Sequence, residues 1–259
     1  MIIQLAVDTA TRYSSFLNNF QAALCILVVV VGFCFALMIA LSLHEMAHAY
    51  AAKLNGDLTA QYAGRLTANP FKHFDTIGLL MMFLVGFGWA KPVPIDPRNF
   101  NNVKKGMIQT SIAGVITNVI MATIFALLYT AFSLLPQPDV LNVNTWFFIW
   151  LLLEYFFYFG LIFNINFFLF NLIPLFPLDG HRLIEALYPQ SKVVAFLRRY
   201  GSMILIGLIF FSYITESFIG IDLSPLTLYI SNVGSWIRNG LLELWRLFFG
   251  IFGLKVGIF

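Results

Sequence analysis

Four long stretches of the chain are almost entirely hydrophobic, and shorter polar stretches separate them. The first covers residues 20–43, and residues typical of a helix continue from it to about Leu54. The other three cover residues 106–135, 146–173 and about 193–213. About 20 apolar residues in a helix cross the hydrocarbon core of a bilayer, so each stretch is long enough for a transmembrane helix.

The segment between the first two predicted spans has a different pattern. Residues 57–76 are mixed and rich in turn-forming residues, and their alternation predicts a small β-hairpin. Residues 77–88 are apolar but too few to span a bilayer, which is typical of a re-entrant or interfacial segment. Pro92, Pro94 and Pro97 follow, and they exclude helix and favour an extended chain.

The C-terminal part of the chain, residues 223–259, mixes apolar and charged side chains. Its charged residues are Arg238, Glu243, Arg246 and Lys255. This pattern predicts either an amphipathic helix along the membrane surface or one further span. Because no repeat, linker or low-complexity tract divides the chain, we expect a single domain over residues 1–259, with a core of about residues 20–190 and a C-terminal span and tail in 191–259. The expected fold is an all-α polytopic membrane protein, a bundle of about four to six transmembrane helices with a short β-hairpin or re-entrant segment.

Composition supports this reading. The chain is 60% hydrophobic and only 10% charged, whereas a soluble domain is about 25% charged. Soluble globular and disordered proteins are therefore excluded. The net charge is only +3 and no basic block occurs, which argues against nucleic acid as a partner. Cys25 and Cys34 would lie on opposite sides of one helix, so we expect two free thiols.

The basic residues predict the orientation in the membrane. Most of them fall in loops on one side of this layout, and these are Lys53, Arg65, Lys72, Lys91, Arg98, Lys104, Lys105, Arg182, Lys192, Arg198 and Arg199. The opposite loop, residues 136–145, has none. Loops rich in Lys and Arg face the cytoplasm, so we expect a cytoplasmic (inner) membrane protein with the first span's C-terminal end inside. The N-terminal residues lack the basic region of a cleavable signal, so we expect the first span to be retained.

The first predicted span ends with the sequence HEMAH, which carries His44, Glu45 and His48. Residues four apart on a helix lie on the same face, so both imidazoles can bind one metal ion. Glu45 lies beside them, where it can take a proton from a metal-bound water. Ionisable residues in a membrane segment are costly, and they usually mark a functional site.

A zinc site of this kind needs a third protein ligand and an open position for water. Asp179 is the best candidate, because it lies in NLIPLFPLDGHR at the cytoplasmic end of the third span, level with the two histidines. Irregular backbone at that depth is tolerated only inside protein or beside a watery cavity. Asp179 is also well placed to cap the helix that follows it. Glu154, Glu185 and Glu216 are the alternatives.

HEMAH combined with PLDG, in spans of this order, resembles the site-2 protease family of intramembrane zinc metalloproteases. FGWAKPVPIDPRNF and AGVITN also look like the family's pattern, and no PDZ or CBS module is visible, as in the minimal type. The resemblance implies one zinc ion per chain bound by His44, His48 and Asp179. It also implies Glu45 as the catalytic base and Asn118 as a group that binds the substrate or the developing oxyanion. An interhelical hydrogen bond is the alternative role for Asn118, because asparagine commonly makes one in membranes.

Two positions depart from that family's pattern. Val115 stands where the family usually has proline, and His181 replaces a glycine that often follows LDG. Asn164 and Asn171 lie on nearly one face of the third span, and we expect both to pack inside the bundle. His73 and His181 are further imidazoles that could hydrogen-bond near the site or assist the intermediate, although loop histidines more commonly have no such role.

The predicted function is hydrolysis of peptide bonds within or near transmembrane segments of membrane proteins. The partners are then the bilayer and a transmembrane substrate, which must be presented in an extended form. Residues 57–70 and 89–97 are the segments expected to offer an edge for it. Two alternatives remain open, namely another membrane zinc peptidase with a Glu as third ligand, and a non-enzymatic metal-binding membrane protein.

Overall fold

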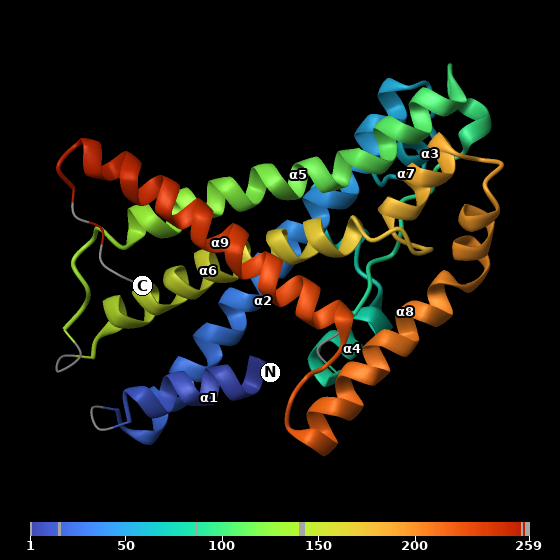
Figure 1. The fold of residues 1–259 in the computed structure, drawn as a ribbon. Helices are drawn as coiled ribbons and strands as arrows, with labels where there is room; N and C mark the ends of the chain where they lie inside the picture. Colours follow the sequence, from blue (N-terminus) through green and yellow to red (C-terminus); the bar gives the residue numbers. More distant parts are fainter. Residues whose placement is uncertain (1, 15–16, 86–87, 140–142, 255, 257–259) are drawn as a thin grey trace.

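A computed structural model describes the whole chain except residues 1, 15–16, 86–87, 140–142, 255 and 257–259 (Figure 1). The described residues form an all-helical structure. They contain no β-strand, and a single antiparallel bridge joins Phe74 to Ala90. The predicted all-α class is therefore confirmed.

Four helices of the described chain are long and apolar enough to cross a membrane, and they coincide with the predicted spans. These are α2 (Asn19–Leu54), α5 (Val103–Phe132), α6 (Thr145–Asn171) and α8 (Lys192–Ile219). The chain is therefore a multi-pass membrane protein. Cys25 and Cys34 are both free thiols, as expected.

Short polar side chains start these helices by accepting hydrogen bonds from otherwise unpaired backbone amides. Asn18 accepts from the amide of Gln21, and the Gln21 side chain accepts from the amide of Asn18, which completes a capping box at the start of α2. Asn102 caps α5 by accepting from the amide of Lys105, and Asn144 caps α6 by accepting from the amides of Trp146 and Phe147. The sequence thus fixes the start of each of these three helices.

Helices α2, α5 and α6 form the centre of the bundle, and α1 (Ile2–Arg12) packs against α2. Gly32 lets α2 approach α6 closely, because a Cβ at this position would lie 3.2 Å from the carbonyl oxygen of Leu152. Phe33 packs edge-on against Phe159 and Phe163. This tight core holds the end of α2 that carries His44 and His48.

Helices α8 and α9 (Pro225–Ile251) lie outside this core (Figure 1). α8 packs against α9 and against the short helix α7 (Asp179–Leu187). α9 lies along α5 and α6 instead, and the Trp245 indole donates to the Thr123 carbonyl oxygen at 3.1 Å. The C-terminal residues thus form one long helix on the outside of the bundle.

The predicted β-hairpin in residues 57–76 is wrong. This segment folds into a short helix, α3 (Thr59–Tyr62), and a 3-10 helix, η1 (Pro70–Lys72). The reason is local hydrogen bonding, because Asp57 and Asn69 accept bonds from backbone amides two residues further on and so close turns. The short apolar segment forms α4 (Thr76–Val85). Residues 91–96 form neither helix nor strand, whereas Pro97, which was predicted to exclude helix, begins a 3-10 helix, η2 (Pro97–Asn99), because proline fits the first position of a helical turn.

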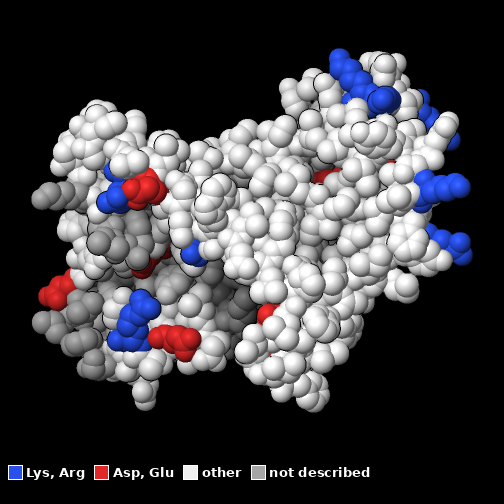
Figure 2. Space-filling model, viewed as in Figure 1, with Lys and Arg blue, Asp and Glu red and all other residues white. Residues whose placement is uncertain are grey.

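Charged side chains are unevenly distributed over the surface. In Figure 2, Lys and Arg gather at the end of the molecule where α3 and α7 lie, whereas its broad middle is almost free of charge. A belt of this kind is expected where hydrocarbon surrounds a protein. The HEMAH end of α2 therefore lies toward the basic end of the molecule.

Candidate active site

His44 and His48 lie near the C-terminal end of α2, one turn apart on the face that points into the bundle. Their side chains are almost fully buried, and their Nε2 atoms are 3.0 Å apart. This convergence follows from the four-residue spacing on a continuous helix. Both imidazoles are thus directed at one point.

Asp179 reaches the same point from another part of the chain. It is the first residue of α7, and the preceding loop is anchored because Leu175 and Leu178 are buried against Leu205 of α8. The Oδ2 atom of Asp179 lies 3.3 Å from Nε2 of His44 and 3.0 Å from Nε2 of His48. One atom from each of the three residues lies within 4.8 Å of the others, so the group could hold a metal ion.

The charge state of Asp179 suits a cation ligand. Burial acts to raise the pKa of this carboxyl, but the neighbouring imidazoles of His48 and His44 lower it more. The resulting pKa lies below the ordinary value, so the side chain is an ionised carboxylate. This is the form in which aspartate binds a metal.

Hydrogen bonds on the other side of the two rings fix their tautomers. Nδ1 of His48 lies 2.7 Å from the carbonyl oxygen of Thr110, which can only accept, so the ring proton is on Nδ1. Nδ1 of His44 lies 2.6 Å from Oδ1 of Asn118 and is protonated for the same reason. When each ring is neutral, Nε2 therefore carries the lone pair that a metal ion can bind. This donor set of two neutral imidazoles and one carboxylate fits zinc.

A second asparagine holds the first. The Nδ2 atom of Asn118 donates to Oδ1 of Asn164 at 2.9 Å, and the Nδ2 atom of Asn164 donates to the carbonyl oxygen of Gly160 at 2.7 Å. Neither asparagine has any exposed surface. The chain of bonds from α6 through α5 to His44 thus leaves the amide of Asn118 one orientation, with its oxygen toward the ring.

Gly114 explains how α5 comes so close to the two imidazoles. A Cβ at this position would lie 2.4 Å from Nε2 of His48 and 2.5 Å from Cε1 of His44. Gly114 is the glycine of the AGVITN sequence, four residues before Asn118. Only glycine therefore leaves room for both rings beside α5.

Glu45 is oriented by the extended chain rather than by another helix. Its Oε2 atom accepts a hydrogen bond from the Val93 amide at 3.2 Å. We refer to residues 90–96 as the strap. The strap is itself held by Arg65, which donates to the Lys91 carbonyl oxygen, and by His73, whose carbonyl oxygen accepts from the Lys91 amide.

Asp57 joins the end of α2 to the far end of the strap. It accepts bonds from the Asp96 amide at 2.8 Å and from Nδ2 of Asn99 at 3.0 Å, besides those from Thr59. Burial acts to raise the pKa of Asp57, but these hydrogen bonds lower it more, so its pKa is below the ordinary value. Asp57 thus acts as an ionised anchor for the strap.

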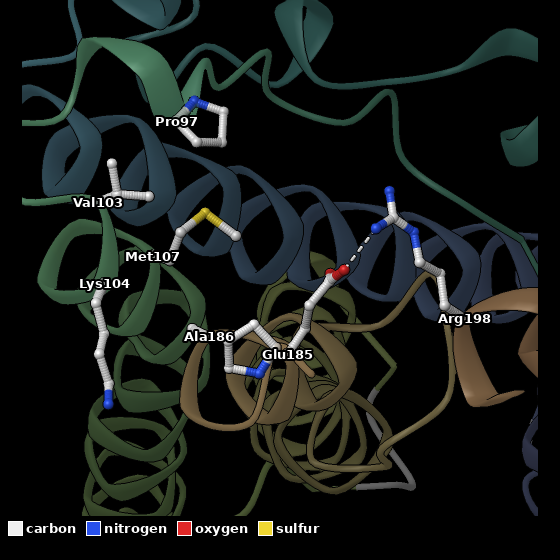
Figure 3. Close-up of a pocket in the computed structure, with 8 residues that line it drawn as sticks. Pro97, Val103, Lys104, Met107, Glu185, Ala186 and Arg198 are labelled. Atoms are coloured by element: carbon white, nitrogen blue, oxygen red, sulfur yellow. Dashed lines mark hydrogen bonds and ion pairs between the residues drawn. The ribbon is translucent and has the colours of Figure 1, made fainter. Parts of the chain in front are cut away.

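Glu185, one of the alternative third ligands, lies elsewhere. Its Oε1 atom accepts from Nη1 of Arg198 at 2.7 Å. The pair lines a surface pocket of about 540 Å³ that also includes Lys104 and Met107 of α5 (Figure 3). Among the described residues, the group of metal-binding side chains contains Asp179 and none of the three glutamates.

The two further histidines stabilise loops. His73 is fully buried, and its Nε2 atom lies 2.8 Å from the carbonyl oxygen of Thr67. His181 is also fully buried, with Nε2 3.3 Å from the carbonyl oxygen of Val194 at the start of α8. Neither belongs to the group around Asp179.

Three supporting features were not predicted from the sequence. The Thr110 carbonyl carries no sequence signal, because every residue has one. Asn164 was expected to pack inside the bundle, and it does, but its bond to Asn118 depends on how two helices align. Gly114 offered a usable signal, since a glycine one turn before a polar residue in a span often marks close helix packing.

Comparisons with known proteins agree with this geometry. A model of peptidase family M50 matches residues 32–214. The "Putative zinc metalloprotease YwhC" of Bacillus subtilis (strain 168) is 39% identical over 155 residues, which are 60% of this chain and 68% of the relative. No solved structure matches the chain significantly.

Proposed function

The chain belongs to peptidase family M50, the site-2 protease family, and we propose that His44, His48 and Asp179 bind its zinc ion while Glu45 serves as the catalytic base. It is a zinc metalloprotease, and its four spans make it an intramembrane protease. We propose one ion per chain and one domain over residues 1–259. The observation that carries the proposal is the convergence of three ligand atoms whose tautomers and charge suit zinc.

When bound, zinc polarises the scissile carbonyl and lowers the pKa of its bound water to about 7. Glu45 accepts a proton from the attacking water as the new C–O bond forms. It then gives this proton to the amide nitrogen as the C–N bond breaks, so that the amine leaves neutral. The Val93 amide keeps the Glu45 carboxylate directed at the site. Asp179 stays ionised throughout and balances the charge of the cation.

Asn118 acts first as the support of His44. Because its oxygen and nitrogen are both engaged within the bundle, it fixes the ring that presents Nε2. Binding of the oxyanion by Asn118 stays a prediction. It requires the amide to release Asn164, since only the nitrogen can donate to an anion.

We place the site on the cytoplasmic side of the inner membrane. The support for this orientation is the gathering of Lys and Arg at the end of the molecule that carries α3 and α7. Water then reaches Glu45 from the cytoplasm. Glu45 is only half-buried, which is consistent with such access.

A transmembrane substrate must lose its helical hydrogen bonds before its peptide bond can be cut. Because no hairpin forms in residues 57–76, the strap is the remaining edge on which a substrate can lie extended. Its position against Glu45 supports this role, since a peptide along the strap passes the catalytic carboxylate. The substrates are membrane proteins, and regulated intramembrane proteolysis is the proposed process.

The experiment compares zinc content and proteolysis in four purified proteins. Wild type and Glu185→Ala should each carry about one zinc ion, because Glu185 pairs with Arg198. Asp179→Ala should lose most of its zinc, and Glu45→Gln should keep it and lose proteolysis of a membrane-embedded peptide. Full zinc in Asp179→Ala, together with loss in Glu185→Ala, would overturn the ligand assignment. Full proteolysis by Glu45→Gln would overturn the mechanism.

A further inference from the structure

The polar residues of α9 lie on one side of the helix. At 100° per residue they fall within an arc of about 140°. We call this set the polar face of α9, and it comprises Ser231, Asn232, Ser235, Arg238, Asn239, Glu243 and Arg246. The opposite side packs against α5 and α6 through Val233, Ile237, Leu241 and Trp245.

Two contacts place this face beside the spans α5 and α6. Gly234 lies against Ile165 of α6, six residues or about 9 Å before the inner end of that helix. Trp245 donates to Thr123 of α5, nine residues or about 13 Å before the outer end of that helix. Residues 235–244 therefore lie beside the middle parts of α5 and α6, although α9 itself is not among the four helices of the described chain that are long and apolar enough to cross a membrane.

Five of the seven polar side chains of this face are exposed, and Ser235 and Arg238 are half-buried. Glu243 and Arg246 form an ion pair at 2.5 Å, yet their side chains are 48% and 49% exposed. In Figure 2, adjoining acidic and basic atoms lie over the C-terminal half of α9, far from the basic end of the molecule. Asn232 and Asn239 are exposed as well. Such groups are costly against lipid and usually face protein or water.

We propose that the polar face of α9 is covered by the same face of a second copy of this chain. Both copies insert in the same direction, so the two-fold axis lies along the membrane normal and the two α9 helices run parallel. Each residue near the axis then meets its own counterpart. The Asn239 oxygen accepts a bond from Arg238 of its own chain at 3.3 Å. Because a side-chain amide both donates and accepts, Asn239 can also pair with its counterpart in the second copy.

The charges are also self-complementary in this arrangement. Glu243 and Arg246 lie one turn apart, so Glu243 of each copy can pair with Arg246 of the other in two reciprocal ion pairs. The face extends over residues 231–246, about 22 Å or four turns, which is enough for a helix–helix contact through most of the core. Packing of small and polar residues is the usual means by which membrane helices associate.

A charge exchange tests this pairing. The Glu243→Arg chain carries two cations at the two positions, and the Arg246→Glu chain carries two anions. Each variant alone should repel itself, whereas a mixture should form two ion pairs between unlike chains. Fluorescent chains are counted in lipid vesicles, and zinc content is measured for each variant as the control for folding.

Wild type should be dimeric, each variant alone should associate at least tenfold more weakly, and the mixture should recover unlike pairs. A monomeric wild type would overturn the proposal, and so would zinc-loaded variants that dimerise alone as well as wild type does. Disulfide trapping gives a second measurement that leaves the charges in place. Ser235→Cys should cross-link, whereas Met203→Cys on exposed α8 and the native thiols of wild type should not. Equal trapping at both positions would contradict the proposed face.

Discussion

Two pairs of asparagines in membrane-length helices have opposite surroundings. Asn118 and Asn164 are fully buried and bonded to each other, and Asn118 is also bonded to His44. Asn232 and Asn239 are exposed on α9, at the outside of the bundle. All four are the same residue type in helices of similar length, and composition does not distinguish the two pairs.

The difference shows what burial adds to a polar residue. Within α2, α5 and α6, an amide has one set of partners and one orientation, so it can fix the tautomer of a metal ligand. On α9 the amide of Asn239 is bonded instead to Arg238 of the same helix face, whose Nε donates to its Oδ1 at 3.3 Å. The first pair holds the ring of His44, a proposed zinc ligand, whereas the second pair lies on the face proposed to meet a second copy of the chain.

Gly114→Ala should give the largest effect, because the added methyl group would meet both imidazoles at 2.4–2.5 Å. Strain of about 1–3 kcal/mol at the site corresponds to a loss of about 5- to 150-fold in zinc affinity. Competition with a chelator measures it. Gly240→Ala on α9 is the control, since nothing lies within 4 Å of a Cβ there. Equal zinc affinity in both variants would contradict the close packing at α5.

Asn118→Leu should weaken zinc binding by about 10- to 100-fold, because His44 loses the partner that fixes its ring. Asn239→Leu is the matched control and should keep the wild-type affinity. Asn164→Leu should have a smaller effect than Asn118→Leu, since it acts through Asn118. If Asn118→Leu binds zinc as tightly as wild type does, the hydrogen bond from Asn118 to His44 contributes nothing to the free energy of zinc binding.

Asp57→Asn should lower the free energy of unfolding by about 1–2 kcal/mol at neutral pH, because a buried ionised acceptor is lost. The pKa of Asp57 is lower in the folded protein than in the unfolded chain, where it is about 3.9. Ionised Asp57 therefore stabilises the fold at a pH above 3.9, and this stability is lost as the pH falls through the pKa of the folded state. Thermal unfolding should therefore show a difference between the two proteins at pH 7 that shrinks below pH 4. A difference that stays constant with pH would exclude the carboxylate as its source.

Trp245→Phe should give the smallest effect. It removes one hydrogen bond between α9 and the carbonyl oxygen of Thr123, and such bonds contribute about 0.6 kcal/mol on average in membrane proteins. Zinc affinity should not change. Unfolding in mixed micelles, compared with Asn118→Leu, would show whether α9 is energetically separate from the metal centre.

The long apolar runs predicted the membrane spans, because a chain with so few charged residues cannot be a soluble protein. The sequence also predicted that His44 and His48 lie on one face, because residues four apart on a helix always do. Asp179 was predicted as the third ligand because it lies in irregular backbone level with the two histidines. The β-hairpin was wrong because Asp57 and Asn69 satisfy nearby amides with their own side chains, which an alternating pattern does not reveal. The bond from Asn118 to Asn164 was not predictable, because the alignment of α5 with α6 depends on the packing of the whole bundle.

The bond chain from Gly160 to His44 has an evolutionary consequence. Asn118 keeps its oxygen toward His44 only while residue 164 offers an acceptor, and Asn164 does so only while its nitrogen is held by Gly160. Gly160 in turn has no room for a Cβ, which would lie 2.3 Å from the ring of Phe125. Mutation at position 44, 118 or 164 therefore changes which residues are acceptable at the other two, whereas a backbone carbonyl is present at position 160 whatever its side chain. Among descendants of this chain, these three positions should drift together, whereas those on the outer side of α8 should drift independently.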